Sequence, residues 1–143
     1  MSTKWIRALF VVAGFYDGLL GVAFVFFWRT IFRHFDVEPP NHPGYVQFPA
    51  LLLIVFAAMF LRVARDPLRN RELILYGMGL KLAFSGTAFW YELTAGIPRM
   101  WIPWAWADLG FLLLFLLAWL RLSAAQSATP GDVPGGITGR EAR

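Results

Sequence analysis

Four long apolar runs constrain the fold of this chain more than any other feature of its sequence. They cover residues 5–28, 48–63, 73–93 and 100–122. A helix needs about 20 mostly apolar residues to cross the hydrocarbon core of a bilayer, and spanning segments must be helices or strands of a closed barrel. Barrel strands alternate apolar and polar residues, and these runs do not. The sequence therefore predicts an all-α integral membrane protein, a bundle of four transmembrane helices.

Composition agrees with a membrane protein and excludes several other classes. Of the 143 residues, 58% are hydrophobic and 15% are charged, whereas soluble domains carry about 25% charged residues. The chain has no cysteine, which excludes disulfides, thiolate nucleophiles, iron–sulfur clusters and cysteine zinc sites. We expect one transmembrane domain at residues 1–122. Residues 123–143, which lack periodicity, are expected to form a disordered cytoplasmic tail.

The basic residues predict the orientation. Seven lie at one end of the predicted bundle: Lys4, Arg7, Arg62, Arg65, Arg69, Arg71 and Arg121. Three lie at the other end: Arg29, Arg33 and Arg99. Because cytoplasmic segments carry the excess of Lys and Arg, we expect an inner-membrane protein with both termini in the cytoplasm. This placement also accounts for the net charge of +4 without nucleic acid as a partner.

The first outer connection carries secondary site candidates. Four apolar residues recur there at helical spacing: Trp28, Ile31, Phe32 and Phe35. The pattern predicts a short interfacial helix that continues the first span. Residues 36–49 could then fold over the mouth of the bundle as a lid. Glu92, at the end of the third span, would lie beside Glu38 and His42 in a small acid–imidazole site, with ordinary interfacial roles as the alternative.

Three ionisable residues interrupt the apolar runs: Asp17, Lys81 and Asp108. A charge at mid-bilayer costs about 2.5–3.5 kcal/mol, so such residues are functional candidates by default. From their spacing to the nearest basic edge residue, the first two lie about 15 Å deep and Asp108 about 20 Å deep. Small residues such as Gly14 and Gly77 share the helix faces of Asp17 and Lys81, which predicts that both point into the bundle. The spacing leaves the direction of Asp108 open.

A buried Asp17–Lys81–Asp108 cluster has three interpretations. It could hold the helices together as a network of ion pairs. It could bind a ligand or relay protons, with the aspartates as proton acceptors or ligand partners and Lys81 as their counter-ion. It could also face a partner subunit, in a homo-oligomer or a larger membrane complex, and the Gly14-x-x-x-Gly18 step would be the contact. Membrane lipids are the other expected partners.

No complete catalytic or cofactor motif accompanies the cluster. His34 and His42 are the only histidines and lie outside the predicted membrane core, which excludes a bis-His haem and argues against a metal centre. Phosphate loops, Ser-His-Asp sets and His-Glu-x-x-His motifs do not occur. We therefore expect no cofactor and no metal. The aromatic residues are expected to serve packing and lipid contact, with an outer interfacial belt formed by Trp28, Trp90, Tyr91, Trp101 and Trp104.

Several short motifs point to a family. They are residues 15–21 (FYDGLLG), a proline-bearing first outer loop, residues 65–67 (RDP) and residues 79–81 (GLK). With these motifs, residues 5–122 resemble the small four-helix membrane proteins of bacteria known as DoxX-like. The resemblance implies the four-helix architecture, and some members of that group resemble subunits of quinone-linked oxidoreductases. It assigns no functional residue in this chain.

The leading functional hypothesis is a membrane protein whose Asp17–Lys81–Asp108 cluster binds a small or lipophilic ligand or relays protons. One alternative is a non-catalytic accessory subunit of a larger membrane complex, in which lipid-facing aromatic residues would matter most. The other is a membrane enzyme acting on a lipid-like substrate. A cavity shaped for an acyl or isoprenoid chain and touching Asp17 or Asp108 would favour that enzyme.

Overall fold

The computed structural model describes residues 3–127, and within that range its regular secondary structure consists of helices joined by short loops. Its elements, in chain order, are α1 (Lys4–His34), α2 (Gly44–Arg65), α3 (Leu73–Thr94), the short 3-10 helix η1 (Arg99–Trp101) and α4 (Ile102–Ser127). Four helical segments, the last formed by η1 and α4 together, are long and apolar enough to cross a membrane. The predicted four-helix architecture is confirmed at this level.

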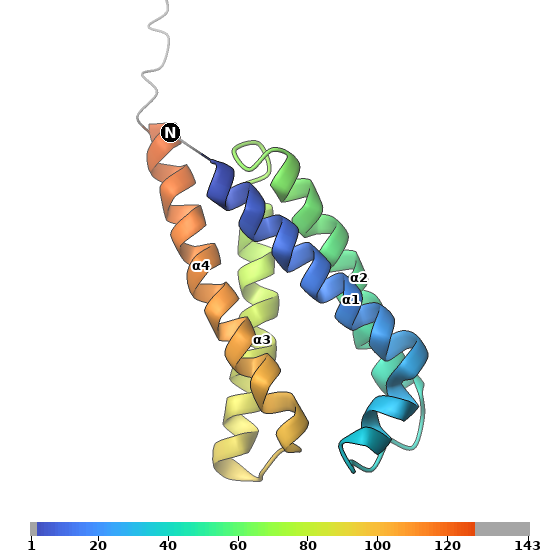
Figure 1. Cartoon of the computed structure of the whole chain (residues 1–143). Helices are drawn as coiled ribbons and strands as arrows, with labels where there is room; N and C mark the ends of the chain where they lie inside the picture. Colours follow the sequence, from blue (N-terminus) through green and yellow to red (C-terminus); the bar gives the residue numbers. More distant parts are fainter. Residues whose placement is uncertain (1–2, 128–143) are drawn as a thin grey trace, which may run out of the picture.

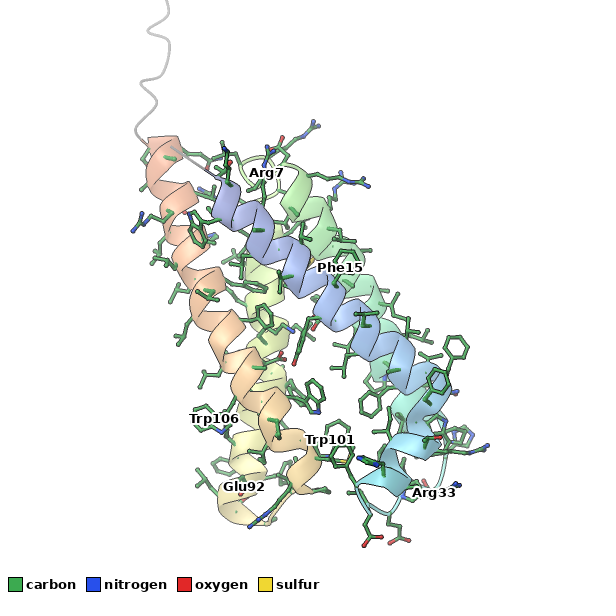
Figure 2. The ribbon with its side chains drawn as sticks, in the orientation of Figure 1. Arg7, Phe15, Arg33, Glu92, Trp101 and Trp106 are labelled. Carbon is green, nitrogen blue, oxygen red and sulfur yellow. The ribbon has the colours of Figure 1, made fainter. Side chains whose placement is uncertain are left out.

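The helices form two pairs, α1 with α2 and α3 with α4 (Figure 1). The pairs meet at the end that carries the N-terminus, the α2–α3 loop and the end of α4, and they splay apart toward the other end. Basic residues of the α2–α3 loop and Arg7 lie at the closed end, while Arg33 lies at the splayed end (Figure 2). The outline is therefore a V, with the predicted cytoplasmic side at its apex.

Glycines on α1 bring the first pair into close contact. A Cβ atom on Gly21 would lie 2.7 Å from the carbonyl oxygen of Ala50, and one on Gly14 would lie 3.0 Å from Leu61. Gly18 faces Ala57 in the same way. Small residues allow this approach of two backbones. The Gly14/Gly18 face is thus covered by α2 of the same chain, so the idea that it supplies a contact between subunits is wrong.

Aromatic residues fill the closed end of the V. Phe10, Phe60 and Phe115 are each 0% exposed. The rings of Phe10 and Phe115 stack at 4.6 Å between centroids, and those of Phe60 and Phe115 lie 5.1 Å apart. Buried aromatic rings contribute more to a core than any other side chains. We call these three residues the aromatic plug, because they occupy the space between the helices at that end.

Some predicted boundaries differ from the structure. The segment predicted to continue the first span does so as part of α1, but the helix ends at His34 rather than near Glu38, and its final turns bend back toward the second pair (Figure 1). The expected lid is shorter than residues 36–49, because α2 begins at Gly44. The tail was expected from residue 123, yet α4 continues to Ser127, since Ala124 and Ala125 favour helix. The rest of the predicted tail, residues 128–143, lies outside the described residues.

Candidate functional site

The three ionisable residues of the apolar runs, Asp17, Lys81 and Asp108, meet in one cluster. The Nζ atom of Lys81 donates hydrogen bonds to Oδ1 of Asp17 at 2.6 Å and to Oδ1 of Asp108 at 2.9 Å. The side chains are 0%, 1% and 7% exposed for Lys81, Asp17 and Asp108. Two carboxylates thus share one ammonium group away from solvent, as charged groups in a low-dielectric interior must. The predicted cluster is therefore present.

Three helices supply one residue each. Asp17 lies on α1, Lys81 on α3 and Asp108 on α4, so the cluster joins the two helix pairs. On α3, Ser85 sits one turn beyond Lys81 and donates its Oγ hydrogen bond to the Lys81 carbonyl at 2.6 Å. On α4, Ala105 is 0% exposed one turn before Asp108, which shows that this face of α4 points inward. The direction of Asp108, open in the sequence, is thereby settled.

Aromatic rings surround the ammonium group of Lys81. Its Nζ lies 5.1 Å from the ring centroid of Tyr16, 5.4 Å from that of Phe111 and 5.9 Å from that of Phe60. A cation within about 6 Å of a ring face is attracted by the ring quadrupole, more strongly when water is excluded. Phe60 also belongs to the aromatic plug, so the plug closes the cluster on the side of the V apex.

Two polar atoms beside Lys81 have no hydrogen-bond partner among residues 3–127. They are Oδ2 of Asp17 and the hydroxyl oxygen of Tyr16, and both atoms are buried. Buried polar atoms are nearly always hydrogen-bonded, and each exception calls for an explanation such as a bound molecule. The cluster therefore has unused hydrogen-bonding capacity next to its ion pairs.

A large apolar cavity reaches the cluster from the splayed end. Its volume is about 560 Å³, within the range of about 300–1,000 Å³ that is typical of small-molecule pockets. Tyr16 and Asp108 line its inner end, while Pro40 and Ile97, from the two outer connections, line its mouth. Asp108 is the one charged residue among the described residues that line it. The cavity therefore has an apolar body and an acidic inner end.

One side of the cavity is closed by side chains and the other is open. On the α1/α4 side, aromatic pairs close the gap: Phe24 stacks on Trp101 at 5.6 Å between centroids, and Tyr16 lies 6.0 Å from Trp104. Figure 2 shows Trp101 between the ends of the two pairs. On the α2/α3 side, the lining residues Leu52 and Thr87 are exposed. In a bilayer, an exposed apolar rim at this position would face lipid chains.

The secondary candidates do not form a site. Glu38, His42 and Glu92 are all exposed. Figure 2 places Glu92 at the tip of α3, across the opening from the α1–α2 loop that carries the other two. Within residues 3–127, no group of three His, Cys, Asp or Glu side chains is placed to hold a metal ion. His42 instead accepts a hydrogen bond at Nδ1 from the Gly44 amide at 3.0 Å, next to the start of α2.

The sequence analysis assigned Trp101 and Trp104 to an outer interfacial belt, whereas in the structure both side chains line the cavity. Trp28 is also packed inside, at 8% exposure, whereas Trp90 at 65% and Tyr91 at 47% face outward. The sequence did contain a pattern that indicates the cavity. Trp101, Trp104 and Asp108 follow the spacing i, i+3, i+7, which places them on one helix face.

Comparison with known protein families, curated proteins and solved structures found no match. The DoxX-like resemblance therefore stays a prediction from the short motifs.

Proposed function

We propose that this chain is an inner-membrane protein that binds a lipophilic ligand in the cavity between its helix pairs. The ligand's apolar body would lie between the pairs, and its polar group would reach Asp108. The observation that carries this proposal is the position of the cavity, which runs from the outer connections to the buried ion pairs. Ligand pockets typically combine an apolar lining with a few polar groups that fix orientation.

The rim of the cavity supports entry of the ligand from the bilayer. Leu52 on α2 and Thr87 on α3 are exposed cavity residues, whereas contacts between aromatic rings close the α1/α4 side. A lipophilic molecule is concentrated in the hydrocarbon region and would enter between α2 and α3 without crossing water. With the arginine-rich apex in the cytoplasm, as the basic residues predict, the cavity would occupy the outer half of the membrane.

Binding is favoured over a proton relay and over catalysis. A relay through one chain would need a polar path on both sides of the cluster, and the aromatic plug fills the space on the apex side. An enzyme would need a nucleophile with a base, or an acid with a base. Asp108 is the one carboxyl or imidazole group among the described residues of the cavity lining, and Lys81 already binds it. An accessory role in a larger complex would be compatible with binding.

Single cysteines test the proposal cleanly because the chain has none of its own. Thr87→Cys places a thiol in the cavity lining. Glu92→Cys places one at the exposed end of the same helix, outside the lining. Dodecyl amphiphiles with an amine, alcohol or carboxylate head are added to the protein in lipid nanodiscs, and the rate of reaction with N-ethylmaleimide is measured.

We expect at least one amphiphile to slow the labelling of Thr87→Cys severalfold while the labelling of Glu92→Cys stays unchanged. A ligand in the cavity would cover the first thiol but not the second. If none of the amphiphiles slows Thr87→Cys more than Glu92→Cys, the cavity does not take a lipophilic chain and the proposal fails.

A further inference from the structure

We infer that the ligand is a lipophilic cation, an amine or ammonium group on an apolar body. This inference rests on the proposed function and names the chemistry of the polar group that the cavity selects. The first observation is the formal charge of the Asp17–Lys81–Asp108 cluster. Two carboxylates face one ammonium in the cluster, so the formal charge of the three side chains is −1. No other charged residue among the described residues lines the cavity.

The remaining acceptors of the cluster are the second observation. Asp17 is not among the described residues that line the cavity, so its buried Oδ2 does not face a ligand, and the acceptors that do come from Asp108 and Tyr16. Asp108 binds Lys81 through Oδ1 and also lines the cavity, which leaves its second oxygen for a donor on the cavity side. The unpartnered hydroxyl of Tyr16 lies at the same inner end. An ammonium group has donors and no acceptor, and so complements the second Asp108 oxygen and the Tyr16 hydroxyl oxygen.

The aromatic lining is the third observation. Tyr16, Phe24, Phe84, Trp101 and Trp104 all line the cavity. Aromatic ring faces attract ammonium groups, because the faces carry negative charge density. The cluster already uses this chemistry, since Nζ of Lys81 lies 5.1 Å from the Tyr16 ring. A ligand ammonium beside Asp108 would meet the same kind of surface, whereas a carboxylate there would be repelled and would find no cationic residue in the described lining.

The test compares three radiolabelled probes that share one chain: dodecylamine, dodecanol and dodecanoate. At neutral pH the amine is charged, as the amine of lysine is. The unmodified protein is placed in phosphatidylcholine nanodiscs, and binding to empty nanodiscs is subtracted. We expect saturable binding of dodecylamine at least about tenfold tighter than that of dodecanol, a difference of about 1.4 kcal/mol, and no saturable binding of dodecanoate.

Variants locate the binding. Asp108→Asn should weaken dodecylamine binding by about tenfold or more, while Lys81 keeps its bond to Asp17 and the cluster becomes neutral. Ala83→Trp fills the cavity lining and should abolish binding. Gly79→Trp adds the same bulk one turn away on α3, where nothing lies within 4 Å of a new Cβ, and should leave binding unchanged.

The outcomes separate the two proposals. If dodecanol or dodecanoate binds as tightly as dodecylamine, and Ala83→Trp abolishes that binding, the cavity is a ligand site and the inference of a cation is wrong. If no probe binds saturably above empty nanodiscs, the proposed function fails and the cation inference with it. Because the probe series uses the unmodified chain, the charge preference is measured even if Asp108→Asn does not fold.

Discussion

Replacing Lys81 with methionine tests how much the buried charges hold the two helix pairs together. Lys81 is 0% exposed and bonds both Asp17 and Asp108. Its loss leaves two carboxylates close to each other in the interior without a counter-ion. Removing one partner of a buried ion pair costs about 3–5 kcal/mol. We expect Lys81→Met to lower the free energy of unfolding by at least that amount.

The aspartate variants are the matched comparison. Asp17→Asn and Asp108→Asn each leave Lys81 with one carboxylate, so the cluster stays paired and loses one charge-assisted hydrogen bond. Such a bond is worth about 1.5–3 kcal/mol, which makes each aspartate change milder than the loss of the lysine. The triple variant with Asn, Met and Asn has no buried charge left. Because apolar or neutral replacements of a whole buried ion pair are often tolerated, it should recover most of the stability lost in Lys81→Met.

The assay is an unfolding titration with sodium dodecyl sulfate in dodecyl maltoside micelles, followed by circular dichroism of the helices. The reasoning is refuted if Lys81→Met is no less stable than Asp17→Asn and Asp108→Asn. It is also refuted if the triple variant remains as unstable as Lys81→Met, since the stranded charges would then not be the cause.

Two further predictions concern packing and orientation. Gly77→Ala should destabilise the protein by about 1–3 kcal/mol, because the new Cβ would lie 2.5 Å from the buried ring of Phe60. The Cβ of Gly79→Ala meets nothing within 4 Å, so this change should stabilise α3 by about 0.5–1 kcal/mol. The same unfolding titration compares the two variants. The exposed positions Glu92 and Arg69 lie at opposite ends of the bundle. With the predicted orientation, a membrane-impermeant maleimide added to intact cells should label Glu92→Cys and not Arg69→Cys. The reverse labelling would invert the proposed topology.

The two aspartates differ in surroundings, and this difference bears on the choice between a structural and a functional cluster. Asp17 is enclosed by the bundle, with its side chain 1% exposed. Asp108 has the same counter-ion but also borders the cavity. One cluster can therefore serve both purposes. Its Lys81–Asp17 pair joins α3 to α1, and its Asp108 carboxylate borders the cavity.

The sequence was sufficient for the number of helices, their approximate bounds and the burial of Asp17 and Lys81. These features depend on local chemistry: an apolar run of sufficient length is a span, and an ionisable residue within it avoids lipid by pointing inward. The outer helix ends were less well predicted, because Gly44 begins α2 before the most apolar residues of that span.

The tertiary structure decided how the helices pair and where the space between them lies. Gly14 and Gly18 were equally suited to a contact within the chain or between chains, and their packing against α2 was decided by shape across two helices. The tryptophans of η1 and α4 could have faced lipid or the interior, and the splay of the two pairs turned Trp101 and Trp104 toward a cavity. A cavity is the volume that several distant segments leave unfilled, and no single run of residues encodes it. The sequence alone therefore determined the four long apolar helices and the charges within them, whereas the packing of whole helices decided that an apolar cavity leads to Asp108.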